Sequence, residues 1–341
     1  MQKLKTLTPV IATLAVAAFI VIGVSVVRLN RHDRDVDENP YEYSLDGLQE
    51  VPSQLVLFNE IDPLPFEVEH AAALAVDADG NIYVAGASSL EKYNSAGQQI
   101  LGVDLPMPAK CLAVDDTGKM YIGTGQAIQV FDKQGKRLAV WDELPDAAVL
   151  TSLAVTENAV FAADAGNRLV YIFTKDGGMS GRIDGAKAHA DGKGFIIPSP
   201  YFDVIEVDSR HVWIVNPGRH LVEKYNITGE ILDSWGYAGM ALDGFSGCCN
   251  PIHIARDADG SFYTAEKGLV RVKQYTERGD FTGVVAAPAK LLDSDSALSS
   301  ERTVKTDCSG AAKITDLAVD PEGRVLVLDC RRKQVRIFAQ K

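Results

Sequence analysis

The chain contains one pattern of apolar and polar positions that recurs six times. In each copy a short apolar segment is followed by a polar turn and then by a second apolar segment. Such a unit has hydrophobic surface on both sides, so neighbouring copies must pack against one another. The copies read LAVDADGNIYVAG from Leu74, LAVDDTGKMYIGT from Leu112, LAVTENAVFAAD from Leu153, IEVDSRHVWIVN from Ile205, IARDADGSFYTAE from Ile254 and LAVDPEGRVLVLD from Leu317.

Four strands are predicted within each copy. In the first copy they cover residues 73–76, 81–85, 90–93 and 99–103, and Gly-containing polar turns separate the first from the second and the third from the fourth. Four antiparallel strands in a repeat of roughly 40 residues are typical of a propeller blade. The repeat therefore predicts a ring of six blades.

The sixth copy has only three predicted strands, at 313–320, 324–329 and 334–339. A separate strand-like segment, residues 55–61, precedes the first copy. This segment can supply the missing outermost strand and so join the two ends of the ring. We therefore expect an all-β six-bladed propeller that is closed by an N-terminal outer strand.

The N-terminal part of the chain differs from the repeats. Residues 1–6 form a short tail, and the uncharged run 7–27 is long enough to span a bilayer as a helix. Residues 28–52 are polar and are expected to form a tether before the propeller at 53–341. We expect an uncleaved membrane anchor with the propeller outside the cytoplasm, and a cleaved signal peptide is the alternative.

The third copy, LAVTENAVFAADAGNRLVYIF, carries a polar signature at Asp164, Gly166, Asn167 and Arg168. These residues resemble the NHL repeat, and the likeness extends over roughly residues 55–341. The resemblance implies a propeller family whose members bind proteins, RNA or small molecules, and which includes some lyases and hydrolases. Looser matches are Asn216, Gly218, Arg219, His220 and Leu221 in the fourth copy, and Asp329, Lys333 and Val335 in the sixth.

The composition narrows the range of partners. The chain is 46% hydrophobic and 23% charged, as in ordinary folded proteins, and its formal net charge is −12. An acidic domain without a basic stripe is a poor match for the phosphate backbone of nucleic acids. We therefore expect no nucleic-acid partner.

The spacing of the repeats indicates where a binding site lies. Successive copies begin 38, 41, 52, 49 and 63 residues apart, and the added residues form the segments 186–200, 236–251 and 287–312. Each segment joins the outermost strand of one blade to the innermost strand of the next, so all three lie on one face of the ring. Long loops often carry function, although surface insertions are also tolerated. We expect a protein partner or a small ligand to bind on this face, at the mouth of the central channel.

Four of the five cysteines belong to the same face. Cys111 lies in an inner strand and is expected to be a small core residue, whereas Cys248, Cys249, Cys308 and Cys330 lie in or beside the long segments. One interpretation is a pair of disulfides that join Cys248 and Cys249 to Cys308 and Cys330. The alternatives are a four-thiolate site for zinc or an iron–sulfur cluster, and a redox-active pair. The segment GFSGCCNPIHIA around the first two also resembles uncharacterised bacterial NHL-type proteins.

Three histidines are further candidates for this face. NHL-type propellers that cleave amidated-peptide precursors use inner-strand histidines to bind zinc and repeat a Pro-His pair. Here only Pro251-Ile252-His253 approaches that pair, with one residue inserted. The candidate residues for the binding face are His189, Arg168, His220, His253 and Lys333.

Taken together, these patterns predict a membrane-tethered, extracytoplasmic NHL-type propeller that acts as a binding or scaffold module without a cofactor. The alternative is a redox protein, lyase or hydrolase that depends on a metal ion or an iron–sulfur cluster at the four cysteines. The sequence assigns no reaction.

Overall fold

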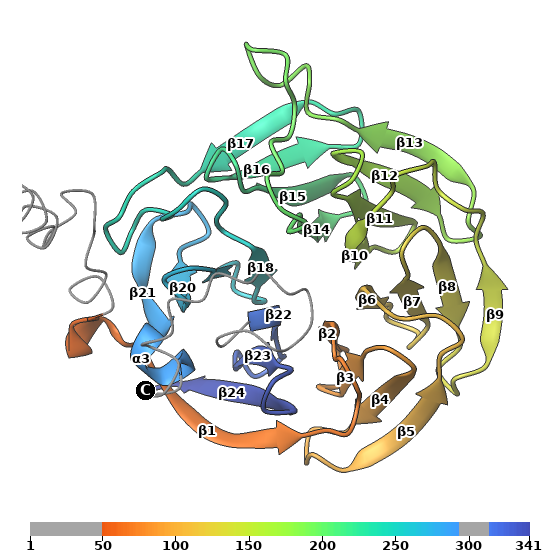
Figure 1. Cartoon of the computed structure of the whole chain (residues 1–341), viewed down its shortest axis with the longest axis horizontal. Coiled ribbons are helices and arrows are strands. Elements are labelled where there is room, and N and C mark those ends of the chain that lie inside the picture. Colours follow the sequence, from red (N-terminus) through yellow and green to blue (C-terminus); the bar gives the residue numbers. More distant parts are fainter. Residues whose placement is uncertain (1–49, 293–313) are drawn as a thin grey trace, which may run out of the picture. The chain divides into compact units, whose positions relative to one another are not determined.

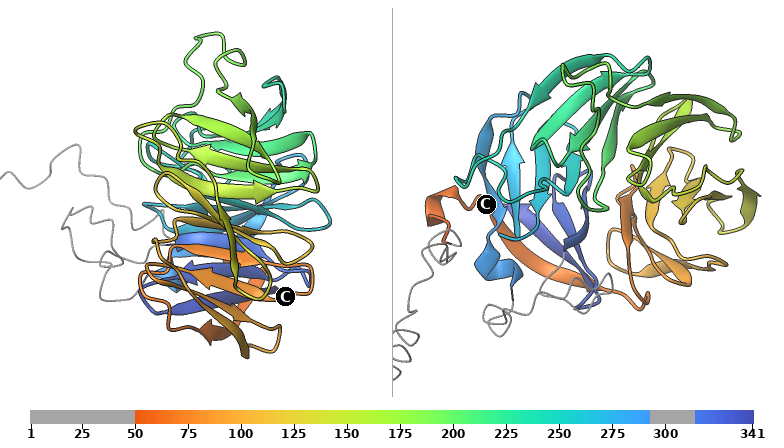
Figure 2. Two further views of the ribbon diagram at one scale, coloured as in Figure 1. Left: turned by 90° about the vertical axis from the view of Figure 1, so that its right-hand side faces the viewer. Right: turned by 45° about the horizontal axis from the view of Figure 1, so that its top comes forward.

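The computed structural model describes residues 50–292 and 314–341, which form six four-stranded antiparallel sheets around a central axis (Figure 1). Figure 2 shows the same ring from the side and from an oblique angle. The predicted six-bladed propeller is confirmed. The predicted membrane span at 7–27 lies outside the described residues, and no helix within them is long and apolar enough to cross a bilayer.

Each blade begins with an inner strand beside the axis and ends with an outer strand at the rim. The predicted strands of the first blade agree with the structure to within one residue at each end. The first three blades consist of β2 (Ala73–Val76), β3 (Ile82–Ala85), β4 (Ser89–Tyr93) and β5 (Gln99–Asp104); β6 (Cys111–Val114), β7 (Met120–Gly123), β8 (Ile128–Phe131) and β9 (Arg137–Val140); and β10 (Leu150–Val155), β11 (Ala159–Asp164), β12 (Leu169–Thr174) and β13 (Met179–Ile183).

The other three blades have the same order of strands. Two short helices, η1 (Ser53–Leu55) and α3 (Pro288–Leu291), lie outside the sheets. The fourth to sixth blades consist of β14 (Val204–Asp208), β15 (His211–Asn216), β16 (Leu221–Asn226) and β17 (Ile231–Trp235); β18 (His253–Arg256), β19 (Phe262–Glu266), β20 (Arg271–Tyr275) and β21 (Phe281–Ala286); and β22 (Ile314–Val319), β23 (Val325–Asp329), β24 (Gln334–Gln340) and β1 (Phe58–Pro65).

The ring is closed by the N-terminal strand, as predicted. β1 pairs antiparallel with β24, so that Phe58 lies opposite Gln340. The strand begins and ends a few residues later than the predicted 55–61. Its pairing is irregular between Ile61 and Leu64, where the chain contains Pro63, which is tolerated because β1 is an edge strand. The sixth blade therefore contains strands from both ends of the propeller.

The hydrophobic core consists of six clusters, each formed by side chains of two adjacent blades. The second strand of each blade is buried almost throughout, because both of its faces pack against a neighbouring blade. Most outer strands are far more exposed, and β9 is exposed along its whole length, whereas β21 is largely buried. Cys111 is buried in one of the clusters, which confirms its predicted core position. No blade can bury its own apolar faces, so the stability of each blade depends on its neighbours.

An aspartate organises the turn after the inner strand of several blades. Asp77 accepts hydrogen bonds from the backbone N–H groups of Asp79 and Asn81, and from the Tyr83 hydroxyl at 2.8 Å. Gly80 completes this turn with a φ of 76°, a conformation that favours glycine. The Asp-x-x-Gly and Tyr positions that recur in the repeat are therefore turn and packing residues.

We predict that ring closure depends on the packing of β1. Phe58 is 3% exposed and packs edge-on against Tyr263 of the fifth blade, with ring centroids 6.1 Å apart. Phe58→Ala should lower the free energy of unfolding by about 3 kcal/mol, because it leaves a cavity between blades. Ile61→Ala, on the same strand but at a 40% exposed side chain, should cost less than about 1 kcal/mol in urea denaturation. Equal losses for the two variants would contradict this role of β1.

Candidate functional site

We call the face that carries the connections between blades the loop-bearing face. The three long connections run from the outer strand of one blade to the inner strand of the next, at 184–203, 236–252 and 287–313. The last of these is described only as far as residue 292. The turns between the second and third strands of each blade lie on the same face. This arrangement follows from the observed strand order and agrees with the predicted position of the long segments.

The connection at 184–203 is held by a buried carboxylate of the blade that it enters. Glu223, the third residue of β16, has no exposed surface and lies 3.1 Å from Nε2 of His189 in the connection. The same carboxylate accepts hydrogen bonds from Asn216 at 3.1 Å and from the Tyr225 hydroxyl at 3.0 Å. His189, a predicted binding residue, therefore lies against the buried carboxylate, and the same connection is hydrogen-bonded to the blade where the Ile196 N–H donates to Asn216 at 3.0 Å.

The connection at 236–252 is held by a buried amine at the equivalent position of the next blade. Lys273 has no exposed surface; its ammonium group forms an ion pair with Glu266 and donates a hydrogen bond to the Gly244 carbonyl at 2.8 Å. It also lies 4.4 Å from the centroid of the Phe245 ring. Burial lowers the pKa of Lys273 to about 8, and the charge of Glu266 opposes this decrease.

The third long connection is held by a guanidinium group at the same strand position of the sixth blade. Arg336 of β24 is 3% exposed and makes a bidentate pair with Glu60 of β1, at 2.7 and 2.8 Å. It also donates a hydrogen bond to the carbonyl of Lys290 in α3, at 2.9 Å. In blades four, five and six, the third residue of the third strand is therefore a buried charged residue that contacts the long connection entering the same blade.

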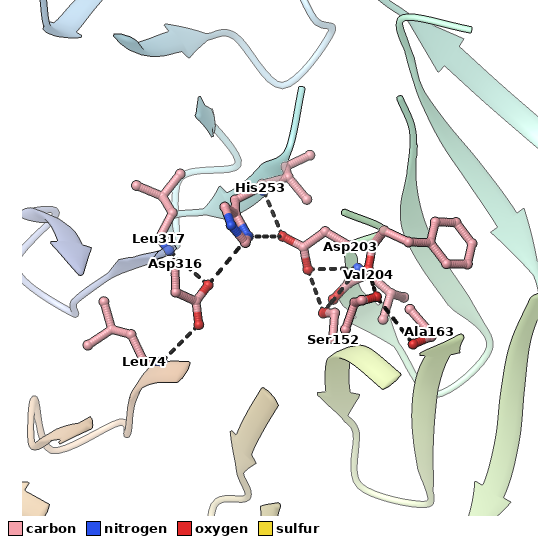
Figure 3. A network of polar contacts seen from close by, with 11 residues as sticks. Leu74, Ser152, Ala163, Asp203, Val204, His253, Asp316 and Leu317 are labelled. Atoms are coloured by element: carbon pink, nitrogen blue, oxygen red, sulfur yellow. Dashed lines mark hydrogen bonds and ion pairs between the residues drawn. The ribbon is translucent and has the colours of Figure 1, made fainter. Parts of the chain in front are cut away.

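A polar network surrounds the axis where the inner strands begin, on the loop-bearing side (Figure 3). Asp203 accepts hydrogen bonds from the Ser152 hydroxyl at 2.5 Å and from the backbone N–H of Ile254 at 2.9 Å. Asp316 accepts one from the N–H of Leu74 at 2.8 Å. These contacts connect the inner strands of blades three, four and five, and those of blades six and one.

His253 lies between the two carboxylates of this network. Its Nδ1 is 3.6 Å from Asp203 and 3.7 Å from Asp316. Burial lowers the pKa of His253, but the close contact with Asp203 and the charges of both carboxylates outweigh burial and raise it above its usual value. Burial raises the pKa of Asp316 to about 6. The Nε2 atom of His253 is buried and has no hydrogen-bond partner among the described residues.

The central channel extends from this network toward the opposite face. The six inner strands line a cavity of about 400 Å³, and a smaller cavity of about 90 Å³ lies beside Ser152, Asp203 and Asp316. Glu206 and Arg256 line the wide section. The surrounding channel wall raises the pKa of the Glu206 carboxyl, although water reaches its side chain.

The adjacent cysteines are free thiols in the structure. The Cys248 and Cys249 sulfur atoms lie 3.2 Å apart, with Cys248 exposed and Cys249 buried. The predicted disulfides from these two residues to Cys308 or Cys330 are therefore not formed, because the two thiols are directed at one another and at Ser199. Cys330 lies where β23 turns into β24, and Cys308 is outside the described residues.

The remaining predicted residues lie apart from one another. His220 donates a hydrogen bond from Nε2 to the Gly247 carbonyl, 2.9 Å away, and Lys333 pairs with Glu69 at 2.5 Å. Arg168 is exposed. Arg168, His220 and Lys333 occupy the same turn position in three blades, with φ angles of 58°, 59° and 51°. Their shared feature is this left-handed turn, and only His253 of the predicted set reaches the axis.

The residues around the axis do not fit the zinc site that the lyase resemblance implies. His253 is the only histidine at the start of an inner strand; the other blades place Ala73, Cys111, Ser152, Asp203 and Asp316 there. Among residues 50–292 and 314–341, no group of three histidine, cysteine or acidic side chains has the geometry to hold a metal ion. The four-thiolate hypothesis does not fit the structure either, because Cys330 is in a disulfide and therefore supplies no thiolate.

Comparison with solved structures supports the fold. The chain is similar to a streptogramin B lyase, with a TM-score of 0.54 and 11% identity over 85% of this chain and 100% of that one. It is also similar to U3-55K, with a TM-score of 0.55, 11% identity, and coverage of 82% and 98%. A structural genomics protein of unknown function from Bacteroides thetaiotaomicron has a TM-score of 0.55, 15% identity, and coverage of 82% and 72%. No protein-family model and no curated protein matches the sequence. At these identities the likeness establishes a propeller fold of this type and leaves the activity open.

We predict that the axial network makes stability depend on pH. Because the folded chain binds a proton at His253 more tightly than the unfolded chain, this contribution is complete below about pH 6.5 and is lost as the pH rises through the raised pKa. Asp316, with its pKa raised to about 6, shifts stability in the same direction between about pH 4 and 6. Urea denaturation between pH 6 and 8.5 should therefore show a falling free energy of unfolding.

The control for this prediction is a histidine outside the network. His253→Gln should flatten the decrease, whereas His70→Asn, at an exposed position with a positive φ that asparagine tolerates, should keep it. If the free energy of unfolding of His253→Gln fell with pH as steeply as that of the wild type, the axial network would not be the cause of the decrease.

Proposed function

We propose that the protein is a binding module that takes a protein partner on its loop-bearing face. We also propose that the segment 7–27 tethers it to a membrane, with the propeller outside the cytoplasm. The proposal is supported chiefly by the kind of side chain that this face exposes, on loops that buried charges hold in place. Propellers of many kinds bind other molecules through one face of the ring, but the fold alone assigns no partner.

The exposed apolar side chains of the connections gather on this face. Tyr237, Met240, Val149 and Met107 are each 41–50% exposed, and all four lie in connections that enter an inner strand. Within the described residues, Ile227 is the one comparably exposed large apolar residue in a turn of the opposite face. Tyrosine, methionine and arginine are enriched in protein interfaces.

The loop that carries Tyr237 and Met240 is ordered before any partner binds. The N–H of Phe245 donates a hydrogen bond to the Tyr237 carbonyl at 2.8 Å, and the N–H of Gly239 donates one to the Phe245 carbonyl at 3.0 Å. Phe245 itself is fully buried against Trp235 and Tyr275. An ordered loop lowers the entropy cost of association, so its exposed side chains are available to a partner in one conformation.

Site-specific photo-crosslinking tests this proposal. A benzophenone amino acid is placed at Tyr237 or Met240 in the full chain, and at Ile227 as the matched control with 41% exposure on the opposite face. Irradiation of the cells that produce the protein should give a discrete adduct from the first two positions and none from the third. Tyr237→Ala should then weaken binding of the adduct partner by about tenfold or more, as expected for an aromatic contact residue.

Two results would contradict the proposed function. One is an equally strong adduct from Ile227, which would place the partner elsewhere or show unspecific capture. The other is the absence of an adduct at both Tyr237 and Met240 while another position on the ring gives one.

A further inference from the structure

The two adjacent cysteines form a small, well-defined site on the loop-bearing face. Cys248 and Cys249 lie in the connection that enters the fifth blade, with their sulfur atoms 3.2 Å apart. Asn250, which follows them, is buried; its side chain donates to the carbonyls of Ser246 at 2.6 Å and Lys267 at 2.9 Å. It also accepts a hydrogen bond from the Lys267 N–H at 2.9 Å. The two thiols are therefore positioned by a fixed segment of chain.

A lysine and a serine complete the surroundings of the inner thiol. The Ser199 hydroxyl donates to the Cys249 sulfur at 3.3 Å, and the Lys267 ammonium donates to the Ser199 oxygen at 2.7 Å. Burial alone would raise the pKa of Cys249, but its interactions with Lys267, Ser199 and Cys248 lower it. The same contact with Cys249 raises the pKa of Cys248. Of the two thiols, Cys249 is therefore the one that loses its proton more readily.

We propose that Cys248 and Cys249 are a thiol–disulfide exchange site that reacts with disulfides and dithiols of other molecules. The exposed Cys248 passes its proton to Cys249 and attacks one sulfur of an incoming disulfide. This step forms a mixed disulfide and releases one thiolate, which takes up the proton that Cys249 received. The Cys249 thiolate beside Lys267 then attacks the Cys248 sulfur and releases the second thiolate, which takes a proton from the solvent. Overall, one disulfide is reduced to two thiols, and the cysteine pair is oxidised to a disulfide.

The geometry makes this site suited to exchange and less suited to a permanent cross-link. The α-carbons of adjacent residues are about 3.8 Å apart, closer than the usual range of roughly 4.4–6.8 Å in disulfides. A disulfide between neighbours is therefore strained, and strained, exposed disulfides are readily reduced. The pair can consequently return to the dithiol by oxidising another dithiol. This inference is independent of the protein partner proposed above.

Glutathione disulfide is the probe for the test. The full chain, with the pair reduced, is incubated with glutathione disulfide, quenched with acid, alkylated and analysed by peptide mass spectrometry. The wild type should form an intramolecular Cys248–Cys249 disulfide and release two glutathione molecules. Cys249→Ser should stop at a stable glutathione adduct on Cys248. Cys248→Ser should react slowly, because the remaining Cys249 is buried.

Lysine variants provide a second, independent readout. Lys267→Met should measurably slow the release of glutathione from the mixed disulfide, because loss of the ammonium group raises the pKa of Cys249 and so lowers its thiolate fraction. Lys193→Met, an exposed lysine of the connection at 184–203, should leave the rate unchanged.

Three outcomes would overturn the proposal. They are a lasting glutathione adduct in the wild type, a disulfide from Cys248 or Cys249 to Cys308 or Cys330, and equal release rates in Lys267→Met and the wild type.

Discussion

The structure depends on one constraint: every blade has two apolar faces and can bury them only against other blades. Six core clusters, each shared by two blades, satisfy this requirement around the ring. The last interface exists because β1 pairs with β24, which brings Phe58 opposite Gln340. The strands are therefore constrained by packing between blades. Changes in sequence and length are tolerated mainly in the connections between the strands. The long connections all emerge on one face for the same topological reason.

The buried charges under these connections are costly, and this cost indicates their role. A buried ion pair is often no more stable than apolar residues of the same volume, whereas loss of one partner leaves an uncompensated charge. Glu223, Lys273 and Arg336 each find their partners partly in a loop or in the closing strand. These three charged groups keep their partners only when the long connections adopt the observed conformation. We therefore interpret them as groups that specify the conformation of the loop-bearing face, with the exposed Tyr237 and the cysteine pair placed on it.

The sequence predicts the strands well because their signal is local. The apolar period, the turn residues and the unpaired segment before the first blade were sufficient to place the ring, its closure and the buried Cys111. The site was harder to predict because its contacts join distant residues, such as Ser199 with Lys267 and Asp203 with Ile254. The sequence signal for the loop contacts is a charged residue at the third position of the third strand in blades four to six: Glu223, Lys273 and Arg336. The cysteines were expected to bond across the face, but Cys248 and Cys249 lie against each other on one fixed turn.

The central claim is that buried charges in the third strands fix the loop-bearing face, and amide hydrogen exchange tests it most directly. In Lys273→Met, the N–H groups of Gly239 and Phe245 should exchange about tenfold faster or more, because their loop loses its hydrogen bond at Gly244. The N–H groups of β19 should keep their protection. Gln129→Met, at the equivalent position beneath a short connection, should leave residues 236–252 unchanged. Unaltered exchange in the loop of Lys273→Met, or an equal increase throughout the fifth blade, would contradict the account.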